Sequence, residues 1–480
     1  MSLVQPTEPV PVAKLGRVHF VGMGGVGMSG IARVLLQLGV EVSGSDAKDG
    51  RLLRDLAELG ADTHVGHDAA HVGTADTVVV SSAVRPDNPE LVEARRRGLR
   101  VLPRAAALGA LLLERRGVAV AGTHGKTTTT SMLTVVLQQA GAEPGYVIGG
   151  ALVTTGLGAD AGAGEIVVAE ADESDGSFLM LSPEVAVVTN VEADHLDNYS
   201  GGLEQIHANF AAFAERVGTT LVAGADDPGA RRVAETAAGL GKRVLTFGES
   251  ADADYRVSDI AAEGFRTAFT LTPPGGEPLR GELAVPGRHN VLNAAAAVAA
   301  ADVLGHDPQV ALAGLAAYTG VGRRFELKGT SGGVSVYDSY AHHPTEIAAD
   351  LRAARAALDT RESAEGAAPG RVVAVFQPHL YSRTRIFAAE FAEALALADE
   401  AVVLPVYAAR EDPEPGVGPE LITDRVPGDA ARVHLIADRD EAVARAAALA
   451  RPGDIVLTMG AGDVTELGPR IVAALPGAED

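Results

Sequence analysis

The sequence predicts an α/β protein of three domains: a Rossmann-like N-terminal domain, a central P-loop ATPase-like domain with a mixed sheet, and a Rossmann-like C-terminal domain. Three observations support this. A chain of 480 residues is longer than a single domain with one hydrophobic core ordinarily is. Val-rich strand-like runs alternate with Ala-rich helical segments. Two glycine-rich turns each join a strand to a helix. We place the domains at residues 1–117, 118–327 and 328–480.

Composition narrows the class of protein. Apolar residues make up 47% of the chain and aromatic residues 4%, which suits a soluble α/β enzyme. The net charge of −23 argues against nucleic acid as a partner, because that binding needs a basic face. The absence of cysteine excludes disulfides and thiolate metal sites. The apolar window 18–40 contains six glycines and reads as strand, turn and helix. We therefore expect a cytoplasmic protein without membrane insertion.

The first block contains a glycine-rich turn of the kind that binds dinucleotides. Its expected strands are 17–21, 40–44, 77–81 and 99–102, and its expected helices are 26–38 and 90–97. The glycines of the turn are Gly22, Gly24, Gly25 and Gly27, and Asp46 lies about twenty residues beyond the turn. Backbone N–H groups there can bind a diphosphate, either of NAD or of a UDP-sugar. A tight turn without a ligand is the alternative.

The second block opens with a phosphate loop. Its expected strands are 118–120, 165–169, 185–190, 220–223 and 243–247, followed by an antiparallel appendage at 256–260, 267–271 and 279–283 and a helix at 291–304. The loop residues are Gly122, Thr123, His124, Gly125, Lys126, Thr127 and Thr128. We expect Lys126 to be exposed and to supply a charge to phosphate, and Thr127 to supply a hydroxyl to Mg²⁺. Val120 replaces the first glycine of a standard Walker A loop, so the loop is a shorter form; it predicts ATP or GTP binding.

Acidic residues follow two strands of this block. The segment 170–175, Glu-Ala-Asp-Glu-Ser-Asp, leaves one strand, and the segment 190–197 leaves another. The carboxyl edge of such a sheet is where ligands bind, and carboxylate oxygens suit Mg²⁺. Glu170 and His195 are the candidate ligands. A solvated acidic loop and an ordinary surface histidine are the alternatives.

Two further segments carry candidate nucleotide contacts. Asn290 and Asn293 lie one helical turn apart, where their amides can read an adenine edge. Asn290 is alternatively a plain N-cap. Arg324 stands at a domain junction, where it can reach a phosphoryl group; a solvated charge is the alternative.

The third block repeats the α/β alternation. Its expected strands are 334–338, 372–377, 400–404, 433–435 and 454–459, and the polar segment 360–370 reads as a flexible loop. Polar segments follow the first two strands, at 338–346 and 377–385. We expect both at the carboxyl edge of one sheet.

Taken together, these motifs resemble those of the Mur ligases over essentially the whole chain. The set consists of Gly-Met-Gly-Gly-Val-Gly-Met-Ser at 22–29, Gly-Thr-His-Gly-Lys-Thr at 122–127, Glu-Ala-Asp-Glu-Ser-Asp at 170–175, His-His-Pro-Thr-Glu at 342–346 and Gln-Pro-His at 377–379. It is most similar to the alanine-adding branch. The resemblance implies ATP and Mg²⁺ as cofactors and UDP-N-acetylmuramate and L-alanine as substrates, and it leaves the oligomeric state open.

The resemblance also assigns roles to residues. Metal ligands are Thr127, Glu170 and His195, and catalytic residues are Lys126, His195, Arg324, His379 and Arg383. The phosphate loop together with Asn290, Asn293, Arg324, Asp338 and His343 binds the nucleotide. Substrate-binding residues are Gly22, Gly24, Gly25, Asp46, Ser81, His195 and Arg383. The family pattern has arginine after the histidine of Gln-Pro-His, where this chain has Leu380.

Three other functions compete with this interpretation. A recycling ligase adds an intact peptide to the same sugar nucleotide, but that branch carries a cysteine in its first glycine turn and this chain has none. An NAD-dependent oxidoreductase leaves the phosphate loop unexplained. A nucleotide sensor needs neither the acidic edge nor the histidines of the third block.

Overall fold

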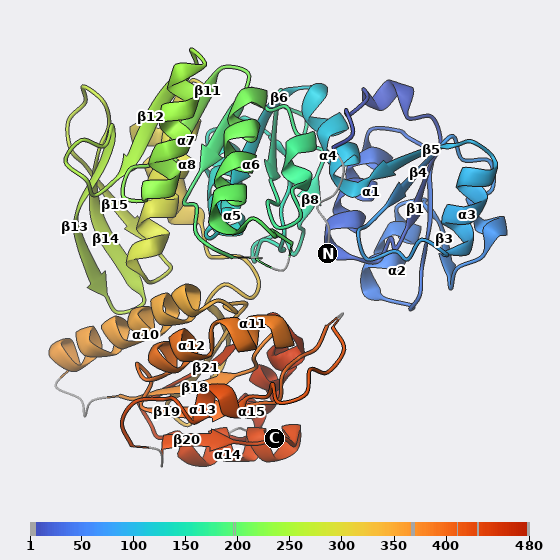
Figure 1. The fold of residues 1–480 in the computed structure, drawn as a ribbon. Helices are drawn as coiled ribbons and strands as arrows, with labels where there is room; N and C mark the ends of the chain where they lie inside the picture. Colours follow the sequence, from blue (N-terminus) through green and yellow to red (C-terminus); the bar gives the residue numbers. More distant parts are fainter. Residues whose placement is uncertain are drawn as a thin grey trace. The chain divides into compact units, whose positions relative to one another are not determined.

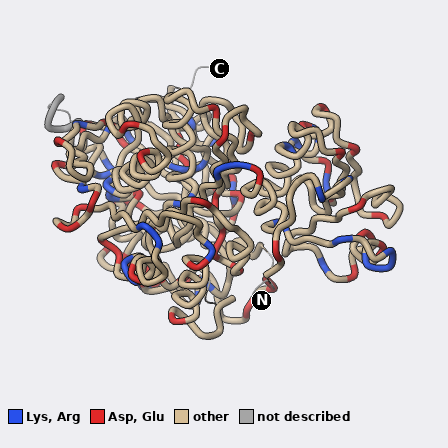
Figure 2. The backbone as a smooth tube through the Cα atoms, turned by 90° about the horizontal axis from the view of Figure 1, so that it is seen from above, with Lys and Arg blue, Asp and Glu red and all other residues tan. Residues whose placement is uncertain are grey.

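The computed structural model describes residues 6–194, 196, 198–365, 370–409, 411–429 and 432–477. By compactness the chain divides into two units (Figure 1). The first unit comprises the residues up to Ser258 together with Thr270–Gly281 and Leu292–Tyr318. The second comprises Asp259–Phe269, Glu282–Val291 and the residues from Thr319 onward. Basic and acidic residues are scattered along the backbone, and neither sign is confined to one region (Figure 2).

The first sheet has five parallel strands in the order β3-β2-β1-β4-β5. The strands are β1 (Val18–Val21), β2 (Val42–Asp46), β3 (Asp62–Val65), β4 (Thr77–Val80) and β5 (Arg100–Pro103), and the helices are α1 (Val26–Gln37), α2 (Arg51–Glu58), α3 (Pro89–Arg96) and α4 (Arg104–Leu113). Phe20 and Val21 enter different cores, because successive strand residues face opposite sides of a sheet. The turns that follow these parallel strands share one edge, as the Rossmann-like prediction required.

The second sheet has ten strands in the order β15-β14-β13-β12-β11-β10-β6-β9-β7-β8. Its strands are β6 (Arg116–Ala121), β7 (Gly145–Val147), β8 (Ala159–Asp160), β9 (Ile166–Glu170), β10 (Val185–Val188), β11 (Thr220–Gly224), β12 (Arg243–Gly248), β13 (Tyr255–Glu263), β14 (Arg266–Thr272) and β15 (Leu279–Leu283). Its helices are α5 (Lys126–Gln139), α6 (Gly202–Arg216), α7 (Pro228–Gly239), α8 (Arg288–Val303) and α9 (Pro308–Gly314).

This second sheet is mixed, as predicted. The pairs from β12 through β11, β10, β6 and β9 to β7 are parallel, whereas β7 and β8 are antiparallel. The strands expected as an appendage belong to this sheet: β13 to β15 continue it beyond β12, and Tyr255 pairs in parallel with Phe247. Strand β6 lies between β10 and β9, so the loop that leaves it at Gly122 emerges beside the ends of both neighbours.

The third sheet lies within the second unit, in the order β16-β17-β21-β18-β19-β20. Its strands are β16 (Glu326–Ser331), β17 (Val334–Ser339), β18 (Val372–Phe376), β19 (Glu400–Val403), β20 (Val433–Leu435) and β21 (Ile455–Met459). Its helices are α10 (Pro344–Glu365), α11 (Tyr381–Ile386), α12 (Ala388–Leu395), α13 (Glu420–Thr423), α14 (Arg439–Leu449) and α15 (Leu467–Ala474). Alternate residues of β18 enter two cores, one on each face.

One predicted loop is wrong in part. Helix α10 continues through 360–365, where small polar residues suggested a loop. These positions carry Thr, Arg, Glu, Ser, Ala and Glu, none of which breaks a helix. Residues 366–369 of that prediction lie outside the described residues. Among the described helices, none has the length and apolar character needed to cross a membrane.

Candidate active site

Two glycines give the phosphate loop its shape. Gly122 has φ 137° and Gly125 has φ 82°, a left-handed conformation that side chains rarely adopt. A Cβ atom on Gly122 would lie 2.0 Å from the Thr189 hydroxyl oxygen, and one on Gly125 would lie 2.4 Å from Asn293 Oδ1. The loop therefore fits closely against the residues after β10 and against α8, and then enters α5 at Lys126.

Lys126 is held by the loop itself and by the acidic segment. Its Nζ donates to Gly122 O at 2.7 Å and Thr123 O at 3.0 Å, and it lies 2.8 Å from Glu173 Oε2. The expectation of an exposed lysine is wrong, since only 15% of the side chain is exposed. Burial by itself would lower the pKa of Lys126, but neighbouring carboxylates, chiefly Glu173, raise it above its ordinary value, so the ammonium keeps its charge.

Glu173 is the other half of this pair. Its side chain is 3% exposed, and burial raises its pKa to about 7 although Lys126 opposes that shift. The backbone oxygen of Glu173 accepts a hydrogen bond from the Tyr199 hydroxyl. Sequence reasoning included Glu173 in the acidic segment but gave it no partner, because the lysine lies 47 residues earlier.

Thr127 and Glu170 come together as predicted for a Mg²⁺ site. The Thr127 hydroxyl donates to Glu170 Oε1 at 3.1 Å, and the N–H of Gly149 donates to Glu170 Oε2 at 2.8 Å. A hydroxyl and a carboxylate oxygen side by side are hard ligands of the kind Mg²⁺ prefers. The residues therefore fit the ion. His195, the third predicted ligand, lies outside the described residues.

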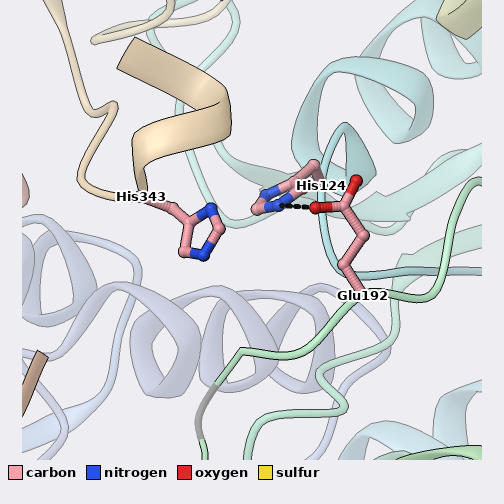
Figure 3. A group of neighbouring side chains, drawn as sticks. All are labelled: His124, Glu192 and His343. Carbon is pink, nitrogen blue, oxygen red and sulfur yellow. Dashed lines mark ion pairs between the residues drawn. The ribbon is translucent and has the colours of Figure 1, made fainter. Parts of the chain in front are cut away.

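Residues after β10 fix the middle of the loop. The N–H of His124 donates to Asn190 Oδ1 at 2.8 Å, while the Thr189 hydroxyl and the Asn190 amide donate to His124 O at 2.6 and 3.1 Å. His124 Nε2 lies 3.5 Å from Glu192 Oε2 (Figure 3). Thr123 belongs to the same network, because its Oγ1 accepts from the N–H of Glu192 at 2.8 Å.

The two asparagines of α8 have different surroundings. Asn293 Oδ1 accepts from the buried Thr129 hydroxyl at 3.2 Å, so this side chain supports the first turn of α5. Asn290 donates to Pro286 O at 2.7 Å. The N-cap alternative for Asn290 is wrong, because α8 begins at Arg288 and Asn290 lies inside its first turn. Thr128 is buried in the first turn of α5.

The first glycine turn is closed by the end of β2. The N–H groups of Gly22 and Met23 donate to Ser45 O at 2.9 and 2.8 Å, and Gly24 N–H donates to Asp46 Oδ2 at 2.9 Å. Gly25 caps α1. A Cβ on Gly22 would lie 4.0 Å from Ser81 Oγ, so the five predicted substrate residues of this domain are close together.

In the second unit, Asp338 is completely buried near the end of β17, which lies between β16 and β21. Its carboxylate accepts from the Thr458 and Thr465 hydroxyls at 2.7 Å each, and Arg323 Nε lies 3.4 Å away. Arg323 also donates to Gly460 O at 2.6 Å. Sequence reasoning missed this anchoring role of Arg323.

Arg324 projects beside an aromatic ring. Its guanidinium carbon lies 5.3 Å from the centre of the Tyr340 ring, and its Nη1 lies 3.9 Å from Glu346 Oε1. These two contacts are a cation–π contact and a long ion pair.

The histidines after β17 and β18 contact aromatic rings. His343 is buried and meets Phe387 edge-on at 4.9 Å; Figure 3 draws its side chain. His379 stacks on Tyr407 at 5.9 Å. Arg383 is buried in α11, and Leu380, at the position of the family arginine, caps that helix with φ 70°.

Comparison with known proteins identifies the family. Three profiles match in order: "Mur ligase family, catalytic domain" over residues 17–116, "Mur ligase middle domain" over 120–301, and "Mur ligase, glutamate ligase domain" over 323–462. The chain belongs to the Mur ligase family. The resemblance found in the sequence motifs is thereby confirmed.

Individual relatives of this Mur ligase are similar over their full length. The UDP-N-acetylmuramate–L-alanine ligase of Thermobifida fusca is 73% identical, with 99% of this chain and 100% of that protein covered. The enzyme of the same name from Kineococcus radiotolerans is 57% identical, with 97% of each chain covered. The crystal structure of MurC from Thermotoga maritima has a TM-score of 0.78 at 31% identity and covers 95% of this chain and 98% of that one.

One contact of this Mur ligase had no signal in the sequence. Arg104, the first residue of α4, donates through Nη2 to Asp172 Oδ2 at 3.1 Å, and its Nη1 lies 2.3 Å from where a Cβ on Gly27 would be. The arginine thus fills the space that Gly27 leaves open. A single arginine at the start of a helix belongs to no sequence motif, so only the tertiary structure reveals this contact.

Proposed function

We propose that this Mur ligase joins L-alanine to the lactyl carboxylate of UDP-N-acetylmuramate in the cytoplasm, using ATP and Mg²⁺. The observation that carries the proposal is the loop from Gly122 to Thr127, in which a charged lysine and a metal-binding hydroxyl both meet acidic residues. The names of the relatives from Thermobifida fusca and Kineococcus radiotolerans support the choice of substrates.

The reaction proceeds in two steps. The lactyl carboxylate attacks the γ-phosphorus of ATP, forming an acyl phosphate and releasing ADP. The amine of L-alanine then attacks the acyl carbon, and the tetrahedral intermediate expels inorganic phosphate and loses a proton to give the amide. Both steps depend on positioning and on neutralising phosphate charge.

The residues of the first unit supply much of that neutralisation. The ammonium of Lys126 binds phosphate oxygens. In doing so it exchanges its ion pair with the Glu173 carboxylate for the phosphate, and it keeps its hydrogen bonds to the carbonyl oxygens of Gly122 and Thr123 in the loop. Thr127 and Glu170, with His195, would hold Mg²⁺, which would offset the negative charge of the phosphates. Asn293 serves the adenine side, as does Asn290, which is on the same helix but belongs to the second unit.

The sugar nucleotide is assigned to the domain of residues 1–117. Its diphosphate is assigned to the N-terminus of α1, into which the Gly22–Gly25 turn leads, with Asp46 and Ser81 close to that turn. In the domain of residues 328–480, Asp338 and His343 serve the nucleotide and His379 and Arg383 serve L-alanine. Arg324, at the end of the central domain 118–327, faces the γ-phosphate.

One assay tests the proposal. Phosphate release is measured with purified protein, ATP, Mg²⁺ and UDP-N-acetylmuramate, with and without L-alanine. We expect release that requires both the sugar nucleotide and L-alanine. Turnover with an intact peptide and none with L-alanine would instead establish the recycling ligase, and NADH oxidation without phosphate release would establish the oxidoreductase.

A further inference from the structure

The first domain contains a fully buried glutamate, none of whose hydrogen-bond partners was given a role above. Glu90 lies in the first turn of α3 and has no exposed surface. A buried carboxylate is costly unless it is paired and hydrogen-bonded, so its partners show what it does.

Those partners come from three different segments. The Ser45 hydroxyl of β2 donates to Glu90 Oε2 at 2.6 Å, and His19 Nε2 of β1 lies 3.4 Å from the same oxygen. After β3, Asp68 N–H donates to Oε1 at 3.3 Å and His71 Nδ1 lies 3.2 Å from it. Burial would raise the pKa of Glu90, but hydrogen bonds from His19 and Ser45 outweigh burial and hold it at about 2, so the carboxylate is ionised.

The contacts of Glu90 lead directly to the first glycine turn. Ser45 uses its side chain for Glu90 and its backbone oxygen for the N–H groups of Gly22 and Met23. The next residue, Asp46, accepts from Gly24 N–H through its carboxylate and from Gly66 N–H through its backbone oxygen. The Glu90 carboxylate therefore fixes the end of β2, to which both the Gly22–Gly24 turn and Gly66 after β3 are hydrogen-bonded.

We propose that Glu90 is a positioning residue for the sugar nucleotide: by fixing Ser45 and the segment after β3, it sets the Gly22–Gly24 turn in the conformation that accepts a nucleoside diphosphate. The inference rests on the proposed function, because it concerns binding of that substrate. Glu90 acts through Ser45 and has no part in the transfer to L-alanine.

The test compares Glu90→Gln with Glu93→Gln in the full-length enzyme. Glu93 lies on the same helix but pairs with Arg96 at the surface, so it controls for the loss of a carboxylate. We expect Glu90→Gln to raise the KM for UDP-N-acetylmuramate about tenfold, the effect of one charged hydrogen bond, while the KM for ATP and kcat change less than about twofold. Glu93→Gln leaves all three constants unchanged. Calorimetric titration with the sugar nucleotide alone gives the same tenfold change in Kd without relying on turnover.

Ser45→Ala covers the case in which Glu90→Gln does not fold. It removes only the hydroxyl, and we expect the same selective rise in the KM for the sugar nucleotide. The inference is overturned if the folded variants bind the sugar nucleotide as the parent does, or if the KM for ATP rises equally. Failure of the proposed function is distinguishable, because then the unmodified enzyme itself shows no turnover with UDP-N-acetylmuramate.

Discussion

The ammonium of Lys126 lies 2.8 Å from the carboxylate of Glu173, and both groups are enclosed by the loop and the acidic edge around them. The pair keeps the lysine charged at the N-terminus of α5, where the first backbone N–H groups of the helix also attract an anion such as phosphate. Removing either partner therefore has a different consequence for activity than for folding.

Lys126→Ala should lower kcat on the order of a thousandfold, because the phosphates lose their fixed cation. The fold should survive, since the pKa of Glu173 is about 7 and the carboxylate left behind can take up a proton. Phosphate release and circular dichroism measure the two effects. Lys242→Ala, which removes a surface lysine whose Nζ lies 3.4 Å from Gly218 O, is the control and should behave as the parent enzyme. Near-normal turnover of Lys126→Ala would remove the loop from the phosphate site.

The Mg²⁺ requirement should move when its oxygen ligands are changed. Glu170→Gln removes the negative charge of one ligand and Thr127→Val removes the hydroxyl of the other, so half-maximal activity should require roughly tenfold more Mg²⁺. His195→Ala should act in the same direction. The control is Glu165→Gln, an exposed residue just before β9. A titration curve of Glu170→Gln that superimposes on the parent curve contradicts the assignment.

The first glycine turn should bind UDP-N-acetylmuramate without ATP. Gly24→Ala should weaken this binding, because a Cβ there lies 2.9 Å from Asp46 Oδ2 and forces the turn away from β2. Gly50→Ala has no atom within 4 Å of its new Cβ and serves as the control. Calorimetry on the full chain measures both. Tighter binding of NADH than of the sugar nucleotide by the parent enzyme counts against the ligase.

Glu90 should contribute pH-dependent stability. Its folded pKa of about 2 lies below the ordinary value, so the contribution is present above about pH 4.5 and is lost as pH falls toward 2. At pH 7 it amounts to roughly 3 kcal/mol. The difference in thermal midpoint between the parent and Glu90→Gln should therefore be largest near neutral pH and shrink in acid. A difference that stays constant from pH 7 to pH 3 would mean that the charge facing His19, His67 and His71 does not matter.

Sequence patterns were sufficient for much of the central site. Gly122 and Gly125 predict the loop, because its backbone conformation favours glycine. The proximity of Thr127 to Glu170 follows from the rule that parallel strands end at one edge of the sheet. The placement of Asp46 beside Gly24 follows from the spacing of a strand–turn–helix–strand unit. These are local rules, and they hold wherever the chain folds as predicted.

Only the tertiary structure decided which charges meet. Glu173 reaches Lys126 across 47 residues, and Glu90 reaches His19 across 71, distances in sequence over which no spacing rule operates. The enclosure of Lys126 and the extension of the central sheet by β13 to β15 were likewise invisible, because both depend on neighbours supplied by other segments. The amino-acid sequence by itself determined the turns, the strands and the chemical groups at the sheet edges. Long-range packing determined the partners of each charged group, because burial and distance fix the charge state of a carboxylate or an ammonium.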